Sequence, residues 1–270
     1  MGDYAIRGGD EGRRRLDLLA RTMAPNTEAL LARAGIHAGM RCIDLGCGAG
    51  HVSRYLAQCV GAGGFVVGLD IDEVKLAAAT QESAQAGLRQ LEFRAGSVTS
   101  WTEPAMYDLV YARFILSHIP EPAKVIGSMA AALRPGGVLV VEDVDFGGAF
   151  CHPPNAGYER YSSWYREVVA RRGGNAELGR ELYGMCLDAG LAAVEVDVVQ
   201  PTHGGGEPEK ALSLSTLTNI ADAIIGEGLA SAEEVAEVMA ELTRYTANPR
   251  AIVSVPRIFQ VWGRAAQAIG

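Results

Sequence analysis

The sequence predicts an α/β fold built around a doubly wound, mostly parallel sheet of seven strands. Three observations predict it. Short apolar or β-branched runs alternate with helical stretches over the first half of the chain. Each run is bounded by Gly, Pro or charged residues, as is typical of strands that are buried on both faces. A glycine-rich turn at 46–50 leads directly from the first run into a helical stretch.

The first half of the chain contains five expected strands, at residues 40–45, 65–70, 90–94, 106–111 and 137–143. Helices are expected among them, at 51–60, 72–86 and 122–134. The Arg134-Pro135-Gly136-Gly137 run should end the last helix, because proline and glycine both disfavour helix continuation. Strands separated by helices are expected to lie parallel, and such sheets bind ligands beyond the carboxyl ends of their strands.

The pattern changes after about residue 145. Two more helices and two more strands are expected, at 154–172, 176–189, 191–199 and 250–262. The segment 201–249 should form two helices, the second beginning at a capping box made by Ser231 and Glu234. We expect this segment to cover the ligand site, and the alternative is a dimerisation hairpin. The chain thus divides into an N-terminal helical cover segment at 1–35, a core at 36–200 and 250–270, and the helical insertion at 201–249.

Composition and charge narrow the functional classes. With 24 Lys and Arg against 32 Asp and Glu, the 270-residue chain has a formal charge of -8, which disfavours DNA or RNA as a partner. No apolar run is long enough to span a bilayer, and residues 1–10 lack the apolar core of a signal peptide. An odd total of five unevenly spaced cysteines fits a reducing compartment. We therefore expect a cytoplasmic monomer or homodimer without nucleic-acid or membrane partners.

The strongest chemical signal is the run Ile43-Asp44-Leu45-Gly46-Cys47-Gly48-Ala49-Gly50, in which a strand enters a glycine turn. The spacing is G-x-G-x-G, and His51 stands where a dinucleotide fingerprint requires a third glycine, so a nicotinamide cofactor is the weaker interpretation. Asp44 would repel a pyrophosphate and suits an amine-bearing ligand. Asp70, at the end of the next strand, can accept hydrogen bonds from two ribose hydroxyls, with Ile71 beside the base.

Together with Gly68-Leu69-Asp70-Ile71-Asp72 and the LRPGG turn at 133–137, this run resembles the class I S-adenosylmethionine-dependent methyltransferases, in particular a bacterial small-molecule branch (type 11 and type 25). The resemblance covers about residues 36–145 and implies a Rossmann-like sheet. It implies that Asp70 and Ile71 hold the ribose and adenine, and that S-adenosylhomocysteine is the product. The residues implied to hold the methionine part of S-adenosylmethionine are Asp44, Gly46, Cys47, Gly48 and Gly50.

Two further segments resemble cofactor-binding parts of that family. Gly96, Ser97 and Val98 follow the third expected strand, where family members often carry an acidic residue that contacts the adenine amine, and here Ser97 stands in its place. Tyr4 and Arg15 belong to an N-terminal segment that folds over the cofactor in the family, with an arginine on the methionine carboxylate. The alternative for this segment is a solvated, basic helix start.

The segment 111–120 resembles the part of the family that lines both cofactor and acceptor. Arg113 is placed to face the methionine carboxylate or to support the loop. His118 is the candidate general base and an acceptor contact, because a neutral imidazole can accept a proton near physiological pH, and its alternative role is structural. The other candidate acceptor contacts are His152, Tyr158, Tyr161 and Leu217. The two tyrosines share one helical face, which is more often part of a core.

The sequence therefore predicts an enzyme that transfers a methyl group to O, N or C of a small metabolite, such as a natural-product intermediate of secondary metabolism. No Cys or His pairing has metal-ligand spacing, so no metal is expected. An RNA or protein methyltransferase is one alternative, disfavoured by the net charge and by the lack of an N-P-P-Y or D-P-P-Y motif. A non-catalytic scaffold that binds S-adenosylmethionine is another.

Overall fold

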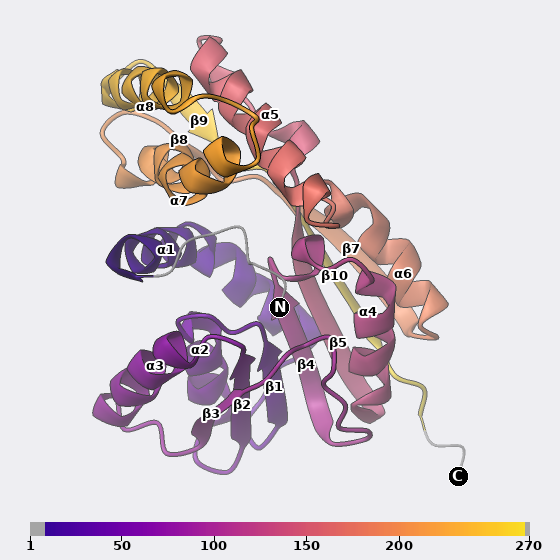
Figure 1. The fold of residues 1–270 in the computed structure, drawn as a ribbon. Coiled ribbons are helices and arrows are strands. Elements are labelled where there is room, and N and C mark those ends of the chain that lie inside the picture. Colours follow the sequence, from indigo (N-terminus) through magenta and orange to yellow (C-terminus); the bar gives the residue numbers. More distant parts are fainter. Residues whose placement is uncertain (1–8, 268–270) are drawn as a thin grey trace.

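A seven-stranded sheet forms the centre of the protein (Figure 1). The computed structural model describes residues 9–267. The strand order is β3-β2-β1-β4-β5-β10-β7, in which β1 to β5 run parallel and β10 is antiparallel to both β5 and β7. The strands are β1 (Arg41–Leu45), β2 (Phe65–Asp70), β3 (Leu91–Ala95), β4 (Tyr107–Arg113), β5 (Leu133–Asp145), β7 (Ala192–Val199) and β10 (Arg257–Arg264). The predicted doubly wound, mostly parallel sheet is confirmed.

Helices cover both faces of the sheet and the carboxyl ends of its parallel strands (Figure 1). One face carries α1 (Gly9–Ala34), α2 (His51–Val60) and α3 (Glu73–Gln85), and the other carries α4 (Pro122–Ala131) and α6 (Leu182–Asp188). Three helices pack against one another beyond the strand ends, and we call them the helical cap: α5 (Ala156–Arg171), α7 (Leu212–Gly226) and α8 (Ala232–Ala247). The short 3-10 turns are η1 (Leu116–His118), η2 (Phe146–Gly148), η3 (Leu178–Glu181) and η4 (Pro208–Ala211).

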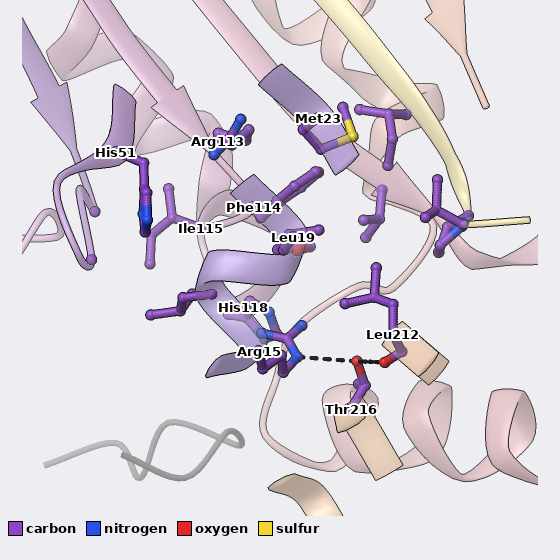
Figure 2. Close-up of a pocket in the computed structure, with 18 of the residues that line it drawn as sticks. Arg15, Leu19, Met23, His51, Arg113, Phe114, Ile115, His118, Leu212 and Thr216 are labelled. Carbon is purple, nitrogen blue, oxygen red and sulfur yellow. Dashed lines mark hydrogen bonds between the residues drawn. The ribbon is translucent and has the colours of Figure 1, made fainter. Parts of the chain in front are cut away.

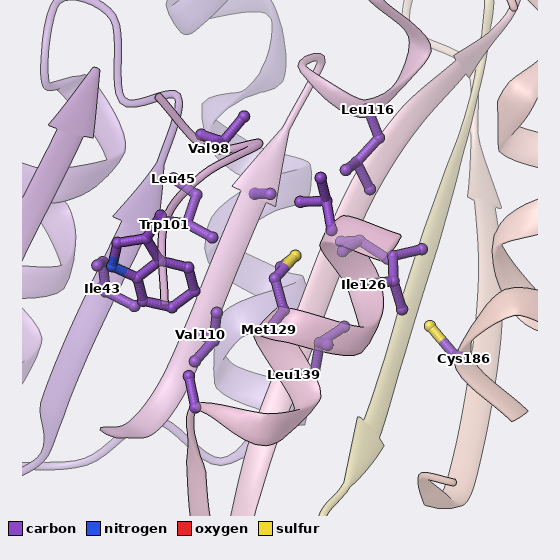
Figure 3. Close-up of a cluster of buried hydrophobic side chains, with 14 of the residues drawn as sticks. Ile43, Leu45, Val98, Trp101, Val110, Leu116, Ile126, Met129, Leu139 and Cys186 are labelled. Carbon is purple, nitrogen blue, oxygen red and sulfur yellow. The ribbon is translucent and has the colours of Figure 1, made fainter. Parts of the chain in front are cut away.

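Both faces of the central strands are buried. Successive residues of a strand point to opposite faces, so Cys42 of β1 packs toward α1 and α2 while Ile43 packs toward α4. Figure 3 shows the cluster that contains Ile43, in which Met129 of α4 lies beside Val110 of β4 and Ile126 of α4 lies toward Cys186 of α6. Burial on both faces explains why these strands are continuously apolar in the sequence.

The last strand differs from the single strand predicted at 250–262. Two strands form instead, β9 (Ile252–Ser254) and β10, and Pro256 lies between them. Proline has no N–H to donate to a strand ladder, so the chain leaves one sheet and enters another at this point. β9 pairs with β6 (Cys151–His152) and β8 (Thr202–His203) in a second, three-stranded sheet that the sequence did not predict.

Two predicted helices are shorter than expected. The helix predicted to end at residue 134 ends at Ala131, and β5 begins at Leu133. The helix predicted at 176–189 is instead η3 followed by α6. A Cβ on Gly179 of η3 would lie 2.8 Å from the Asp143 carbonyl oxygen, so packing against β5 shapes this stretch.

The segment 201–249 contains β8, η4, α7 and α8. The capping box between Ser231 and Glu234 is present, which confirms the predicted start of the second helix. Leu217, Ile220 and Ile224 of α7 are buried in the cluster that joins α7 to α5 and α8. Helix α5, which the prediction assigned to the core, packs against α7 and α8 of the insertion. The predicted domain limits stay a prediction.

A buried carboxylate connects α1 to the sheet. Glu142 of β5 is 1% exposed and accepts hydrogen bonds from the Tyr111 hydroxyl, from Thr27 Oγ1 at 2.8 Å and from Gln260 Nε2 at 2.7 Å. These donors come from β4, α1 and β10. Arg113 Nη1 donates to the same Thr27 hydroxyl at 2.9 Å. The contacts fix α1 beside the carboxyl ends of β4 and β5, and its amino-terminal half packs beside α7.

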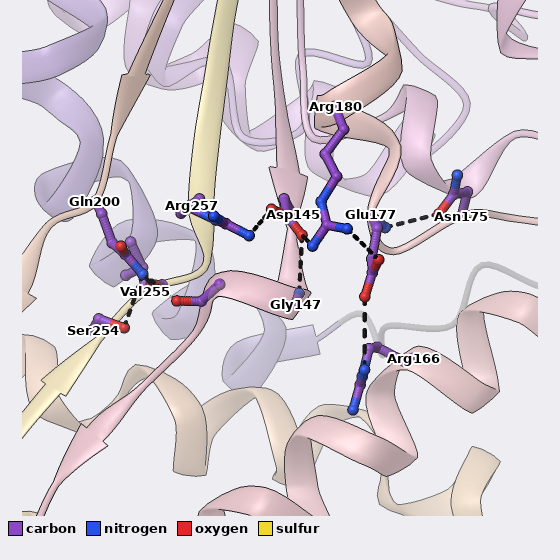
Figure 4. Close-up of polar contacts among 11 residues, drawn as sticks. Asp145, Gly147, Arg166, Asn175, Glu177, Arg180, Gln200, Ser254, Val255 and Arg257 are labelled. Carbon is purple, nitrogen blue, oxygen red and sulfur yellow. Dashed lines mark hydrogen bonds and ion pairs between the residues drawn. The ribbon is translucent and has the colours of Figure 1, made fainter.

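A second buried carboxylate fixes the turn after β5 (Figure 4). Asp145 has no exposed surface, and its side chain accepts a hydrogen bond from the Gly147 N–H at 3.0 Å. It also pairs with Arg180 at 2.8 Å and with Arg257 at 2.6 Å. The three contacts join η2, η3 and β10, and they place Phe146 at the carboxyl end of the sheet.

Replacing Asp145 with Asn should destabilise the protein by about 2 kcal/mol, because Arg257 then loses its counter-charge and Arg180 keeps only its pair with Glu177 at 3.1 Å. This loss of stability is smaller than for a fully buried ion pair, because both arginines are partly exposed and water screens their charges. Urea denaturation measures it. Asp197→Asn is the control, because Asp197 pairs with Arg33 at the surface. Equal effects of the two substitutions would contradict the structural role of Asp145.

Candidate functional site

A cavity of about 270 Å³ lies among the carboxyl ends of the central strands, the first half of α1 and the helical cap (Figure 2). Its two ends differ in chemistry. One end is formed by the glycine turn and by Asp44, Asp70 and Arg113, and the other by aromatic and apolar residues of η2 and the cap. We call them the glycine-turn end and the aromatic end. A cavity therefore lies at the carboxyl edge of the sheet, where the sequence predicts a ligand site.

The conformation of the glycine turn requires glycine. Gly48 has φ of +53° and Gly50 has φ of +72°, in the left-handed region that side chains rarely adopt. A Cβ on Gly50 would also lie 2.7 Å from the Phe93 ring. The N–H groups of Gly46 and Cys47 donate to the Leu69 carbonyl oxygen, at 2.8 and 3.0 Å, and tie the turn to β2.

Asp70 holds the turn and faces the cavity. Its Oδ2 accepts a hydrogen bond from the Gly48 N–H at 2.8 Å, and its Oδ1 accepts one from the Asp72 N–H at 3.0 Å. Each carboxylate oxygen can accept a second hydrogen bond. The Asp70 carboxylate can therefore hold two ligand hydroxyls without releasing the turn. Ile71 lines the same end and is 70% exposed, so a flat apolar group could cover it.

Asp44 is a buried acid at the cavity wall. It is 2% exposed, and it accepts a hydrogen bond from Ser53 Oγ at 2.6 Å. Burial raises the pKa of Asp44 to about 6, although the Ser53 hydrogen bond and the charge of Arg113 act in the opposite direction. A cationic ligand group beside Asp44 would stabilise its charged form. The site is therefore suited to an ammonium group.

Arg113 and His51 complete the glycine-turn end. Arg113 lines the cavity and donates to Thr27, and its guanidinium lies 5.5 Å from the centre of the Phe114 ring. His51 Nε2 lies 3.0 Å from Asp17 Oδ1, and burial, assisted by the charge of Arg54, lowers the pKa of His51. The structure thus brings Arg113, Cys47 and the predicted acids to one end of the cavity.

The aromatic end combines side chains from η1, η2 and α5. Phe146 stacks on Tyr165 with ring centres 4.0 Å apart, and His118 meets Tyr165 edge-on at 6.5 Å. The Tyr158 hydroxyl donates to the Ser254 carbonyl oxygen at 3.0 Å. Burial, together with the charges of Arg15 and Arg172, lowers the pKa of His118 to about 4. The imidazole is therefore neutral at physiological pH.

Arg15 reaches the cavity at the aromatic end. It is 9% exposed, and its Nε donates to Thr216 Oγ1 at 3.0 Å, while that hydroxyl donates to the Leu212 carbonyl oxygen at 2.8 Å. Figure 2 shows Arg15 beside His118 and the two α7 residues at the same end. The predicted helix start is therefore not a solvated basic segment at this position.

Several predicted site residues lie outside the cavity lining. Gly50 packs on Phe93, and Leu217 is fully buried inside the cap. His152 is an exposed residue of β6, so an acceptor contact there has no support from the cavity. Ser97 Oγ shares a hydrogen bond with Thr99, and Val98 packs in the sheet core, so the contact of Gly96, Ser97 and Val98 with adenine stays a prediction. Tyr4 lies outside the described residues.

Sequence reasoning missed two important cavity residues. Phe146 follows β5, and Thr216 lies in the middle of the apolar helix α7. Two threonines, Thr216 and Thr218, interrupt the apolar run 212–225, and they were the available signal for Thr216. Among residues 9–267, no group of three or more His, Cys, Asp or Glu side chains could hold a metal ion. No helix in that same range is both long and apolar enough to cross a membrane.

Comparison with known proteins identifies the family. A family described as "Methyltransferase domain" matches residues 36–180. The chain belongs to the class I S-adenosylmethionine-dependent methyltransferases. One relative is trans-aconitate 2-methyltransferase of Methylobacterium radiotolerans, 36% identical over 43% of this chain and 42% of that protein. An uncharacterized 37.1 kDa protein of a Streptomyces fradiae transposon is 31% identical over 67% of this chain and 52% of that protein. This methyltransferase-family chain spans about half the length of these relatives.

Solved structures show the same fold. A putative methyltransferase of Bacillus halodurans has a TM-score of 0.61 at 18% identity and covers 89% of this chain and 98% of its own. Phosphoethanolamine N-methyltransferase 2 of Haemonchus contortus, solved with S-adenosyl-L-methionine, has a TM-score of 0.57 at 18% identity and covers 90% and 53%. The [4+2]-cyclase SpnF has a TM-score of 0.55 at 18% identity and covers 90% and 82%. At these identities the likeness concerns the fold alone.

Asp44→Asn should make this methyltransferase-family protein more stable at pH 8. The pKa of about 6 lies above the usual 3.8, so wild-type stability is lost as pH rises through this interval, and Asn cannot ionise. The advantage of the variant should shrink by about 1 kcal/mol between pH 8 and pH 5. Urea denaturation at both values measures it, with the exposed Asp188→Asn as control. A pH-independent difference would contradict the burial of a charged Asp44.

Proposed function

We propose that this protein transfers the methyl group of S-adenosylmethionine to an O, N or C atom of a small-molecule acceptor, such as a natural-product intermediate. The observation that carries the proposal is one cavity with two chemically different ends. The glycine-turn end offers carboxylates and backbone N–H groups, and the aromatic end offers a largely apolar space under the cap. Both halves of a group transfer can therefore be bound next to each other.

The residues of the glycine-turn end fit S-adenosylmethionine. Asp44 is a buried carboxylate without a formal ion-pair partner among the described side chains, and it suits the α-ammonium group. Asp70 retains acceptor capacity for the ribose hydroxyls, and Ile71 offers an exposed apolar surface for adenine. Arg113, close enough to Asp44 to lower its pKa, suits the α-carboxylate. When bound, S-adenosylmethionine supplies a methyl group on a positively charged sulfur.

The chain itself contributes position and exclusion of water. The cap and α1 enclose the aromatic end, so a bound acceptor loses contact with bulk water. Holding the acceptor atom and the methyl group in line supplies a large part of the rate enhancement of such reactions. The wall of planar rings from Phe146, Tyr161 and Tyr165 favours an acceptor with a flat apolar body.

We propose that the segment 201–249 helps to select the acceptor. Leu212, Ser213 and Thr216 of α7 line the aromatic end, and His203 of β8 lines it as well. These contacts support the role of a cover over that of a dimerisation hairpin. The net charge and the enclosed cavity support a small acceptor over RNA or protein, whose reacting groups would have to pass beneath the cap. Cytoplasmic location and the oligomeric state stay predictions.

Replacing Asp70 with Ala should weaken S-adenosylmethionine binding at least tenfold, because each hydrogen bond to a charged acceptor contributes about 1.5–3 kcal/mol. Isothermal titration calorimetry measures it, and Asp188→Ala is the exposed control. Tight binding of NAD without binding of S-adenosylmethionine would overturn the proposal. Incubation with S-adenosylmethionine and a panel of metabolites, followed by mass spectrometry, then separates an enzyme from a non-catalytic scaffold. The scaffold releases no S-adenosylhomocysteine.

His118 is proposed to accept the proton of a hydroxyl acceptor. His118→Gln should then lower kcat about 100-fold with a hydroxyl acceptor while leaving cofactor affinity unchanged. Because the pKa is about 4, the wild-type rate should not fall between pH 8 and pH 6 through protonation of this imidazole. The exposed His37→Gln is the control. A His118→Gln enzyme that keeps wild-type turnover at every pH returns His118 to a structural role.

A further inference from the structure

The cavity wall contains a buried arginine that no cofactor contact explains. Arg15 is 9% exposed, and its guanidinium faces the aromatic end. The Nε–H is used by Thr216 Oγ1 at 3.0 Å. Among the side chains described, those of residues 12–267, no other group forms a hydrogen bond or an ion pair with Arg15, so its two terminal amino groups keep their N–H donors for a ligand.

The acidic side chains of the cavity lie elsewhere. Four of the described acidic side chains line it, and three of these, Asp44, Asp70 and Asp72, belong to the glycine-turn end. The fourth, Glu209, pairs with Arg21 at 3.7 Å. A guanidinium is always charged at physiological pH, and a buried charge without a counter-charge is unfavourable. Arg15 therefore stands in a position where a bound anion would be strongly stabilised.

Two arginines that have no ion-pair partner among the described side chains line the cavity, and S-adenosylmethionine carries a single carboxylate. Arg113 is the electrostatic neighbour of Asp44, and Asp44 is the proposed partner of the cofactor's α-ammonium group. In S-adenosylmethionine this ammonium group and the carboxylate are bonded to the same carbon. Arg15 instead has His118 and Tyr161 as its electrostatic neighbours. The cofactor's carboxylate is thus accounted for by Arg113, and the anion for Arg15 must come from the other ligand.

We propose that Arg15 binds a carboxylate on the methyl acceptor, so that the acceptor is an aromatic or similarly flat carboxylic acid. The inference rests on the proposed function, because it assigns the aromatic end to the acceptor. Phe146, Tyr161 and Tyr165 contact the flat body, and the terminal N–H groups of Arg15 donate hydrogen bonds to the two carboxylate oxygens.

Thr216 acts as a positioning residue for this contact. Its hydroxyl donates to the Leu212 carbonyl oxygen at 2.8 Å and accepts from Arg15 Nε, so the hydroxyl orientation is fixed from both sides (Figure 2). The guanidinium plane is thereby held by α7. The helical cap therefore takes a direct part in binding the acceptor, because Thr216 of α7 orients Arg15 of α1.

The experiment titrates aromatic carboxylates into protein saturated with S-adenosylhomocysteine, by calorimetry. The probes are benzoate, cinnamate and indole-3-acetate, each compared with its primary amide, which has the same shape without the charge. The variants are Arg15→Gln, Arg15→Lys and Thr216→Val, and Arg14→Gln is the control because Arg14 is an exposed neighbour on the same helix. S-adenosylhomocysteine affinity is measured for every variant.

At least one carboxylate should bind ten times more tightly than its amide, and Arg15→Gln should remove that preference while Arg14→Gln keeps it. Arg15→Lys should restore part of it, and Thr216→Val should weaken it with S-adenosylhomocysteine affinity unchanged. Equal binding of acids and amides, or no binding of any acid, overturns the proposal. A tenfold loss of S-adenosylhomocysteine affinity in Arg15→Gln alone also overturns it, by assigning Arg15 to the cofactor. Wild-type protein that binds no S-adenosylhomocysteine would instead refute the proposed function.

Discussion

The arrangement of this protein depends on the buried carboxylate of Glu142. It receives hydrogen bonds from three elements, α1, β4 and β10, at the carboxyl side of the sheet. A buried acid is favourable only when such donors surround it, and removal of any one of them leaves a polar group unsatisfied. The network therefore fixes α1 in one register along the sheet. Without that register, Arg15, Leu19 and Met23 would not form a wall of the cavity.

The chemistry of the cavity follows from the elements that reach it. Acids come from the ends of β1 and β2, where the glycine turn leaves room for a ligand. Aromatic rings come from η2 and α5, and the turn at Asp145 holds the first of them in place. The positive groups are distributed between both ends, Arg113 at one and Arg15 at the other. A cavity with this distribution suits two ligands that differ in polarity and that each carry an anionic group.

The sequence predicted those features that local residues determine. The positions of the strands, the glycine turn that joins β1 to α2 and the Ser231 capping box all depend on neighbours within a few positions, and the structure has each of them. The features that were missed depend on contacts between distant residues. The division of the last strand requires β6 and β8 as partners for β9, and the contact of Thr216 with Arg15 joins residues that are 201 positions apart. Leu217 was expected at the acceptor, but a helix that is apolar around much of its surface does not reveal which face packs inside the cap.

The most direct test is a crystal structure of the protein with S-adenosylhomocysteine. The account predicts the ribose on Asp70, the amino group on Asp44 and the carboxylate on Arg113, with the sulfur directed toward His118 and the Arg15 guanidinium left without a ligand. A carboxylate of S-adenosylhomocysteine bound to Arg15, or a nucleoside bound away from Asp70, would contradict the assignment of the two ends of the cavity.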